Sequence, residues 1–136
     1  MRVILDTNIF VSGIHWKNGP SGRVIDLWLD NKFELIISQS IIDEIVETLS
    51  DFKINLSFND IIFWVSVLAD YAVFVEPLFS LEVIKDDKDD NKFLEAGVEG
   101  NADYIISQDN HLLKLKEFKG IKIIKPEEFL RIINKL

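Results

Sequence analysis

The sequence predicts a three-layer α/β/α sandwich with a mainly parallel central sheet. Short apolar runs rich in branched side chains, typical of buried strands, alternate with longer amphipathic segments, typical of helices. This alternation places a helix between successive parallel strands, so helices should cover both faces of the sheet. The chain has 136 residues, of which 48% are hydrophobic, and this supports a single domain over residues 1–136.

The first half of the chain supplies three predicted strands and three predicted helices. The Val-Ile-Leu run at 3–5 is too short for a helix and reads as a buried strand. Pro20 suits a helix start, and either Ser38 or Ser40 is a suitable N-cap. In chain order we expect a strand at 3–5, a helix from 19 to 29, a strand at 33–37, a helix ending at 49, a polar break at 55–60, a helix at 61–71 and a strand at 72–75.

The second half begins with a charged loop at 85–91. Pro126 suits the first turn of the last helix, where Glu127 and Glu128 interact favourably with the helix dipole. The expected elements are a helix over 93–98, a strand at 103–107, a short helix at 110–115, a strand at 121–124 and a helix at 126–136. Trp28, Phe63, Trp64, Val67 and Leu68 are expected in the core, although some of this surface would equally suit a dimer contact.

Composition excludes several kinds of site. The chain has no cysteine, so it has neither a disulfide framework nor a thiolate metal site. His15 and His111 are too few for a typical zinc site, and we expect them at the surface or at helix caps. No apolar run approaches the roughly 20 residues of a membrane span, and no signal peptide is evident, so we expect a cytoplasmic protein with no membrane contact. The net charge of −8 disfavours non-specific attraction to nucleic acid and suits a basic partner.

Four acidic residues from distant segments have a route to one cleft. Asp6 follows the first strand, and Asp109 follows the strand at 103–107. Because parallel strands place their carboxyl ends at one edge of the sheet, these two acids should lie together. Asp90 begins the helix before the later strand, and Glu44 lies early on the helix after the second strand. We therefore expect Asp6, Glu44, Asp90 and Asp109 to form one acidic site.

A divalent cation would resolve the repulsion within such a group. Two carboxylates about 4 Å apart repel by roughly 4 kcal/mol at an effective dielectric constant near 20. Oxygen ligands favour Mg²⁺ or Mn²⁺. Each acid also has a simpler interpretation as a turn or cap residue. The same holds for Thr7, Asn8 and Ser107, which would otherwise orient an acid or a water. Asp86, Asp87 and Asp89 compete with Asp90, and Asp43 and Glu47 compete with Glu44.

Four segments, in this order and at this spacing, resemble the PIN-domain family of metal-dependent ribonucleases, in particular its prokaryotic toxin-like (VapC-like) branch. They are Val3–Ser12, Ile37–Ile45 with Leu49 downstream, Asp87–Ala96 and Ala102–Leu113. Two positions depart from the pattern. Ser107-Gln108-Asp109 stands where relatives commonly have Thr-Gly-Asp, and Lys88 stands where proline is common.

The resemblance implies a PIN-like fold and cleavage of single-stranded RNA with Mg²⁺ or Mn²⁺. It implies that Asp6, Glu44, Asp90 and Asp109 are the acidic site, with Asn8 and Ser107 as polar support. It also implies a homodimer and, for a toxin of a toxin–antitoxin pair, an antitoxin that inserts a segment near the site. A basic antitoxin would match the negative charge of this chain.

On this basis Asp6 is expected to be a direct metal ligand, with Asp90 and Asp109 completing the shell directly or through water. Glu44 would hold a second metal or orient the attacking water. Lys17, Arg23 and Lys92 are candidates for substrate contact, and Trp16 is a candidate for base stacking. The alternative interpretation is that Lys17 and Lys92 are solvated charges and that Trp16 covers an edge of the core. Alternative functions are a non-catalytic interaction module of the same fold, a metal-dependent DNA nuclease, or a small phosphohydrolase.

Overall fold

A computed structural model describes residues 1–136 as a six-stranded sheet with seven α-helices. The strands are β1 (Arg2–Leu5), β2 (Glu34–Ser38), β3 (Val73–Val75), β4 (Tyr104–Ile106), β5 (Glu117–Phe118) and β6 (Ile121–Ile124). The helices are α1 (Thr7–His15), α2 (Pro20–Leu29), α3 (Gln39–Leu49), α4 (Phe58–Tyr71), α5 (Asn91–Glu99), α6 (Asn110–Leu113) and α7 (Pro126–Ile133), and a 3₁₀ turn, η1 (Lys88–Asp90), precedes α5.

The strand order is β3-β2-β1-β4-β6-β5, and all neighbouring pairs are parallel except β5 with β6. After β1 the chain builds the sheet outward through β2 and β3, whereas after β4 it builds in the opposite direction through β6. The point between β1 and β4 is therefore a topological switch point, where parallel sheets place their binding crevices.

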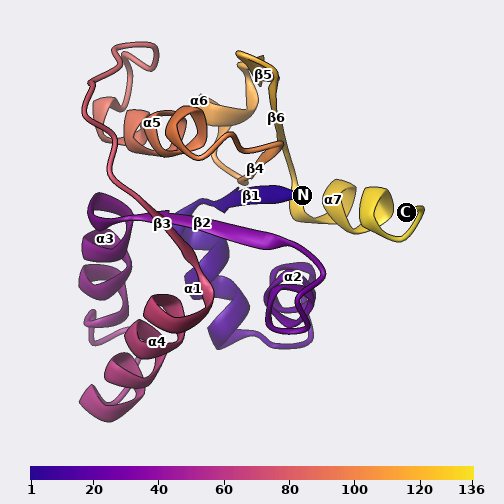
Figure 1. The fold of residues 1–136 in the computed structure, drawn as a ribbon. Coiled ribbons are helices and arrows are strands. Elements are labelled where there is room, and N and C mark those ends of the chain that lie inside the picture. Colours follow the sequence, from indigo (N-terminus) through magenta and orange to yellow (C-terminus); the bar gives the residue numbers. More distant parts are fainter.

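Helices cover both faces of the sheet, which confirms the predicted α/β class. Figure 1 shows α5 and α6 on one side of the strands and α1, α2 and α4 on the other. This division follows from right-handed crossovers, because the connections on either side of the switch point run in opposite directions across the sheet. Helix α7 packs beside α2. The ring of Phe129 on α7 contacts the ring of Phe33, and their centroids are 5.3 Å apart.

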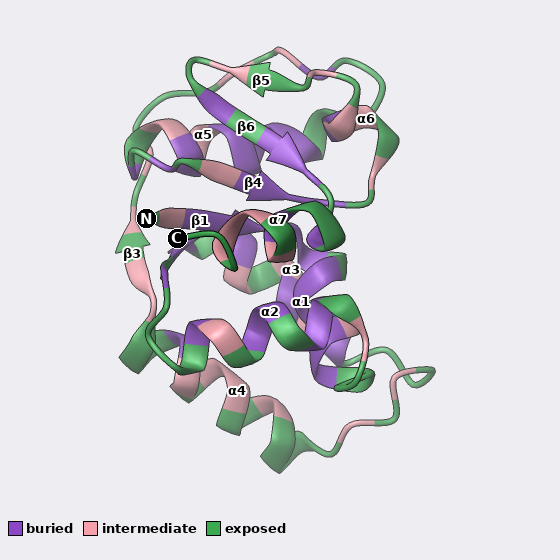
Figure 2. Ribbon diagram, turned by 90° about the vertical axis from the view of Figure 1, so that its right-hand side faces the viewer, coloured by how far each residue is buried: buried purple, intermediate pink, exposed green.

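The core lies between these layers, with the central strands buried on both faces (Figure 2). Val3, Ile4 and Leu5 of β1 are buried, as the sequence predicts for a central parallel strand. Trp28 and Leu68 are also buried, as expected. The expectation for Phe63 is wrong: its side chain is 58% exposed, because α4 is apolar on nearly all sides and only one of these sides faces the domain. Trp64 and Val67 are half-buried.

Two elements are absent from the sequence-based expectations. Helix α1 follows β1 directly, and its Ile9-Phe10-Val11 run is buried in a helix although the run shows no helical periodicity. Strand β5 is only two residues long and forms a hairpin with β6. Lys119 and Gly120 both have positive φ, 50° and 84°, as a type I′ hairpin turn requires.

Serine side chains cap two of the helices. Ser38, rather than Ser40, caps α3, where its Oγ accepts a hydrogen bond from the Ile41 N–H. Ser57 caps α4 through the Asp60 N–H, so this helix begins earlier than the expected residue 61. No helix combines the length and apolar character that crossing a bilayer requires.

Candidate metal centre

The switch point brings together residues that are about 100 positions apart in the chain. Leu5 pairs with Ile106 in the parallel register, so Asp6 and Ser107 leave the sheet side by side. The Asp6 N–H donates to the Ile106 carbonyl at 3.0 Å, which extends the ladder by one residue. The carboxyl ends of β1 and β4 thus place polar side chains at one edge of the sheet, as the sequence predicts.

Asp6 is 4% exposed, and both of its carboxylate oxygens are engaged. Oδ1 accepts the Asn8 N–H at 3.1 Å and so caps α1, whereas Oδ2 accepts the Ser107 hydroxyl at 2.7 Å. Burial raises the pKa of Asp6 above its usual value, and these two hydrogen bonds oppose that effect. The capping interpretation of Asp6 is therefore correct for one oxygen, while the other joins it to the second strand end.

Ser107 connects two of the expected acids. Its buried hydroxyl donates to Asp6 and accepts the Asp109 N–H at 2.9 Å. Asn8 contributes its backbone N–H to Asp6 and leaves its side chain exposed. Thr7 is buried, and its Oγ1 has no hydrogen-bond partner.

Asp90 is the buried acid of the charged loop. Its side chain is 8% exposed, its Oδ2 has no hydrogen-bond partner, and it makes no capping bond although it stands at the start of α5. The pKa of Asp90 is raised to about 8, and burial is the largest cause. The next cause is a hydrogen bond with the Asp109 carboxyl group, followed by the negative charges of Asp109, Asp87 and Asp6. A buried oxygen without a donor, among like charges, fits a cation better than a helix cap.

Four side chains offer ligand atoms that all lie within 4.8 Å of one another: Asp87, Asp90, Asp109 and His111. Asp109 caps α6 by accepting the His111 N–H at 2.8 Å, and His111 Nδ1 lies 3.6 Å from the same carboxylate oxygen. From the sequence, His111 is expected at the surface or at a helix cap, and Asp87 is only an alternative to Asp90. The sequence feature that places His111 in this group is its position two residues after Asp109, on the first turn of α6.

Glu44 lies on α3 outside this group of four. Its carboxylate forms an ion pair with Lys92 Nζ, which also lies 2.6 Å from Asp89 Oδ2. Lys92 is only 9% exposed, so its interpretation as a solvated charge is wrong. Burial lowers the pKa of Lys92, and the negative charge of Asp6 opposes this shift. Asp89 and Asp86 are exposed and paired with Lys92 and Lys114, respectively.

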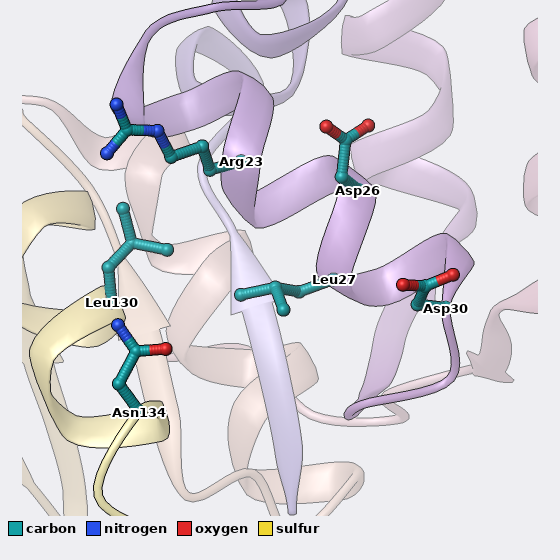
Figure 3. Close-up of a pocket in the computed structure, with 6 residues that line it drawn as sticks. All are labelled: Arg23, Asp26, Leu27, Asp30, Leu130 and Asn134. Carbon is teal, nitrogen blue, oxygen red and sulfur yellow. The ribbon is translucent and has the colours of Figure 1, made fainter.

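The other two expected substrate contacts lie on the surface. Lys17 is exposed in the turn after α1, next to Trp16, which is also exposed. Arg23 lines a depression of about 300 Å³ between α2 and α7, together with Asp26, Leu27, Asp30, Leu130 and Asn134 (Figure 3). None of these residues belongs to the acidic group, and Arg23 is not among the charges that act on Asp6 or Asp90.

The donor set fits a divalent metal ion. Three carboxylates and one imidazole converge, and one carboxylate oxygen is buried without a partner. Burial, followed by the contact with Asp109 and the charges of neighbouring acids, raises the pKa of Asp90 to about 8. Carboxylate-rich sets of this kind suit hard divalent cations.

Comparison with known proteins gives results consistent with this geometry. The PIN-domain family profile matches residues 2–111. The uncharacterized protein MJ1680 of Methanocaldococcus jannaschii is 28% identical over 146 residues, which cover 99% of this chain and 93% of that protein. A chain in the crystal structure of VapBC2 from Rickettsia felis, bound to a DNA fragment from its promoter, matches with a TM-score of 0.60 and 14% identity, covering 90% of this chain and 97% of that one. At this identity the structural match shows a shared fold.

Proposed function

The chain belongs to the PIN-domain family, and we propose that it is a Mg²⁺- or Mn²⁺-dependent endoribonuclease that hydrolyses phosphodiester bonds of single-stranded RNA. The observation that carries the proposal is the buried, unpartnered oxygen of Asp90 within a group of acids at the switch point of the sheet. A divalent ion bound there would lower the pKa of a bound water and stabilise the charge that develops on a phosphoryl oxygen.

The residues of the chain have distinct roles in this proposal. Asp90 and Asp109 hold the ion, and Asp87 and His111 are positioned to add ligands at the solvent side. Asp6 serves as a ligand directly or through water, because Ser107 fixes its carboxylate at the same strand ends. Ser107 also orients the Asp109 backbone, so one hydroxyl sets the spacing between two acids.

We further propose that the protein is the toxin of a toxin–antitoxin pair. Two observations support this role: the shared fold with a chain of VapBC2, and a net charge of −8 that suits a basic antitoxin. A small basic protein encoded immediately upstream would support the pairing, whereas its absence would favour general RNA processing.

The test of the catalytic proposal is the Asp6→Asn variant. Asparagine retains the cap on α1 but removes the charge, so we expect Mn²⁺-dependent cleavage of single-stranded RNA to fall by about 100-fold or more. Asp26→Asn, which removes an exposed carboxylate of α2, is the control and should cleave as the unaltered protein does. Undiminished cleavage by Asp6→Asn would remove Asp6 from the mechanism.

One observation favours a second function, a non-catalytic interaction module. Lys92 is buried and Arg23 lies in a separate depression, so neither offers a positive surface for RNA beside the acids. Calorimetric titration with Mn²⁺ distinguishes the two functions, because a module would bind no ion at millimolar metal. Parallel assays with matched RNA and DNA oligonucleotides distinguish a ribonuclease from a DNA nuclease.

A further inference from the structure

The ammonium group of Lys92 lies inside the acidic region rather than at its rim. Nζ contacts the Glu44 carboxylate and lies 2.6 Å from Asp89 Oδ2. It also lies 5.4 Å from the centroid of the Phe93 ring, within cation–π range. A lysine that is 9% exposed keeps its charge only where acids compensate it, and Glu44 and Asp89 provide this compensation.

Glu44 and Asp89 are thereby set apart from the acids around Asp90. Neither of them belongs to the four side chains whose ligand atoms lie within 4.8 Å of one another. The Oε2 atom of Glu44 is fully buried and faces the Lys92 ammonium group. The acidic region therefore has two parts. The acids around Asp90 have no lysine partner, whereas Glu44 and Asp89 are already paired with the ammonium group of Lys92.

We propose that the Lys92 ammonium group is a built-in cation that takes the place of a second divalent ion, so that the centre binds a single Mn²⁺ or Mg²⁺ on the side of Asp90 and Asp109. This inference rests on the proposed metal-dependent function and deepens it. A second divalent ion held by Glu44 would lie next to the ammonium group, where repulsion between like charges is poorly screened. Lys92 is thus a positioning residue that acts through Glu44 rather than a ligand or a substrate contact.

The test counts bound ions. Purified protein is titrated with Mn²⁺ alone, and free Mn²⁺ is measured by electron paramagnetic resonance. We expect one ion per chain for the unaltered protein and two for Lys92→Met, because methionine approximates the length of the side chain but leaves Glu44 and Asp89 uncompensated. Lys92→Arg retains the charge and should again bind one ion.

Lys114→Met is the matched control. Lys114 also forms an ion pair with a loop acid, Asp86 at 2.8 Å, but both side chains are exposed. The variant changes the net charge by the same amount as Lys92→Met and should still bind one ion. A second ion in Lys114→Met would overturn the inference, because the loss of any nearby positive charge would then be sufficient for a second ion to bind.

The remaining outcomes separate this inference from the proposed function. Two ions in the unaltered protein, or one ion in a Lys92→Met variant with native circular dichroism, would overturn the role of Lys92 but leave a metal-dependent enzyme. If Lys92→Met does not fold, Glu44→Gln decides: retention of one ion with unchanged affinity supports the inference, and loss of that ion overturns it. No bound ion in the unaltered protein would overturn the metal centre itself, and the inference with it.

Discussion

The carboxyl group of Asp90 lies in surroundings that oppose its ionisation. Burial is the largest cause of its raised pKa of about 8, followed by its contact with Asp109, with the charges of Asp109, Asp87 and Asp6 acting in the same direction. Metal-free protein therefore holds a proton at Asp90 at neutral pH, and a divalent ion would have to displace that proton on binding.

The raised pKa has a definite effect on the stability of the metal-free protein. The folded-state pKa of about 8 exceeds the unfolded value of 3.8, so between these values the native state binds more protons than the unfolded chain. The free energy of unfolding should therefore fall as pH rises from about 4 to about 8. Asp90→Asn removes this ionisation, and we expect the variant to be more stable than the unaltered protein by about 1–3 kcal/mol at pH 8.

Urea unfolding in the presence of a chelator, measured at pH 5 and pH 8, tests this expectation. Asp60→Asn on the exposed surface of α4 serves as the control and should leave the pH dependence unchanged. Equal pH dependence in Asp90→Asn and the unaltered protein would show that Asp90 is not the titrating group.

The first residue of α5 holds the charged loop in place. Asn91 is buried, and its Oδ1 accepts the N–H groups of Val83 and Ile84 at 3.1 and 2.9 Å. Its Nδ2 donates to the carbonyls of Ile84 and Lys88, both at 2.9 Å. One amide side chain thus fixes the segment that carries Asp87 against the helix that follows Asp90.

Asn91→Ala should destabilise the protein by roughly 2–4 kcal/mol, because it leaves several buried backbone groups without partners. Chemical denaturation measures the change. Asn59→Ala, on the exposed side of α4, is the matched control, with an expected change within about 0.5 kcal/mol. A loss in Asn91→Ala no larger than that of the control would mean that water replaces all four hydrogen bonds.

Helix α4 presents apolar side chains that the rest of the domain does not cover. They include Phe58, Ile62, Phe63 and Tyr71, all exposed. Beside them a depression of about 530 Å³ is lined by Leu29, Asn31, Phe63, Trp64, Val67 and Tyr71. Exposed apolar surface of this kind suits a protein contact, and the resemblance to the PIN-domain family implies a homodimer.

We therefore expect the protein to have twice its chain mass of 15.7 kDa in solution when measured by light scattering at micromolar concentration. Phe63→Ser should shift the protein toward the monomer, because it removes a central apolar group from this surface. Leu136→Ser, which changes an exposed leucine at the chain end, should leave the mass unchanged. A monomeric unaltered protein would show that α4 does not mediate self-association.

The class of fold, and the edge of the sheet at which the acids gather, follow from local patterns in the sequence. Strand and helix periodicity, serine caps and proline positions are local properties, so they predict the order of most elements. The position of Asp6 directly after β1, and of Ser107 and Asp109 after β4, then follows from the shared direction of parallel strands. Helix α1 and strand β5 could not be predicted in this way, because a short apolar run and a two-residue strand show no periodicity that distinguishes a helix from a strand.

Which side chains meet depends on how the elements pack in three dimensions. Four neighbouring aspartates of the loop have similar sequence surroundings, yet Asp90 is buried, Asp87 joins it, and Asp86 and Asp89 pair with lysines. The contact of Lys92 with Glu44, and that of Ser107 with Asp6 across 101 positions, depend on packing between elements that are remote in the chain. Burial and pairing are properties of the assembled layers, so no local pattern assigns the acids to a metal ion or to a lysine.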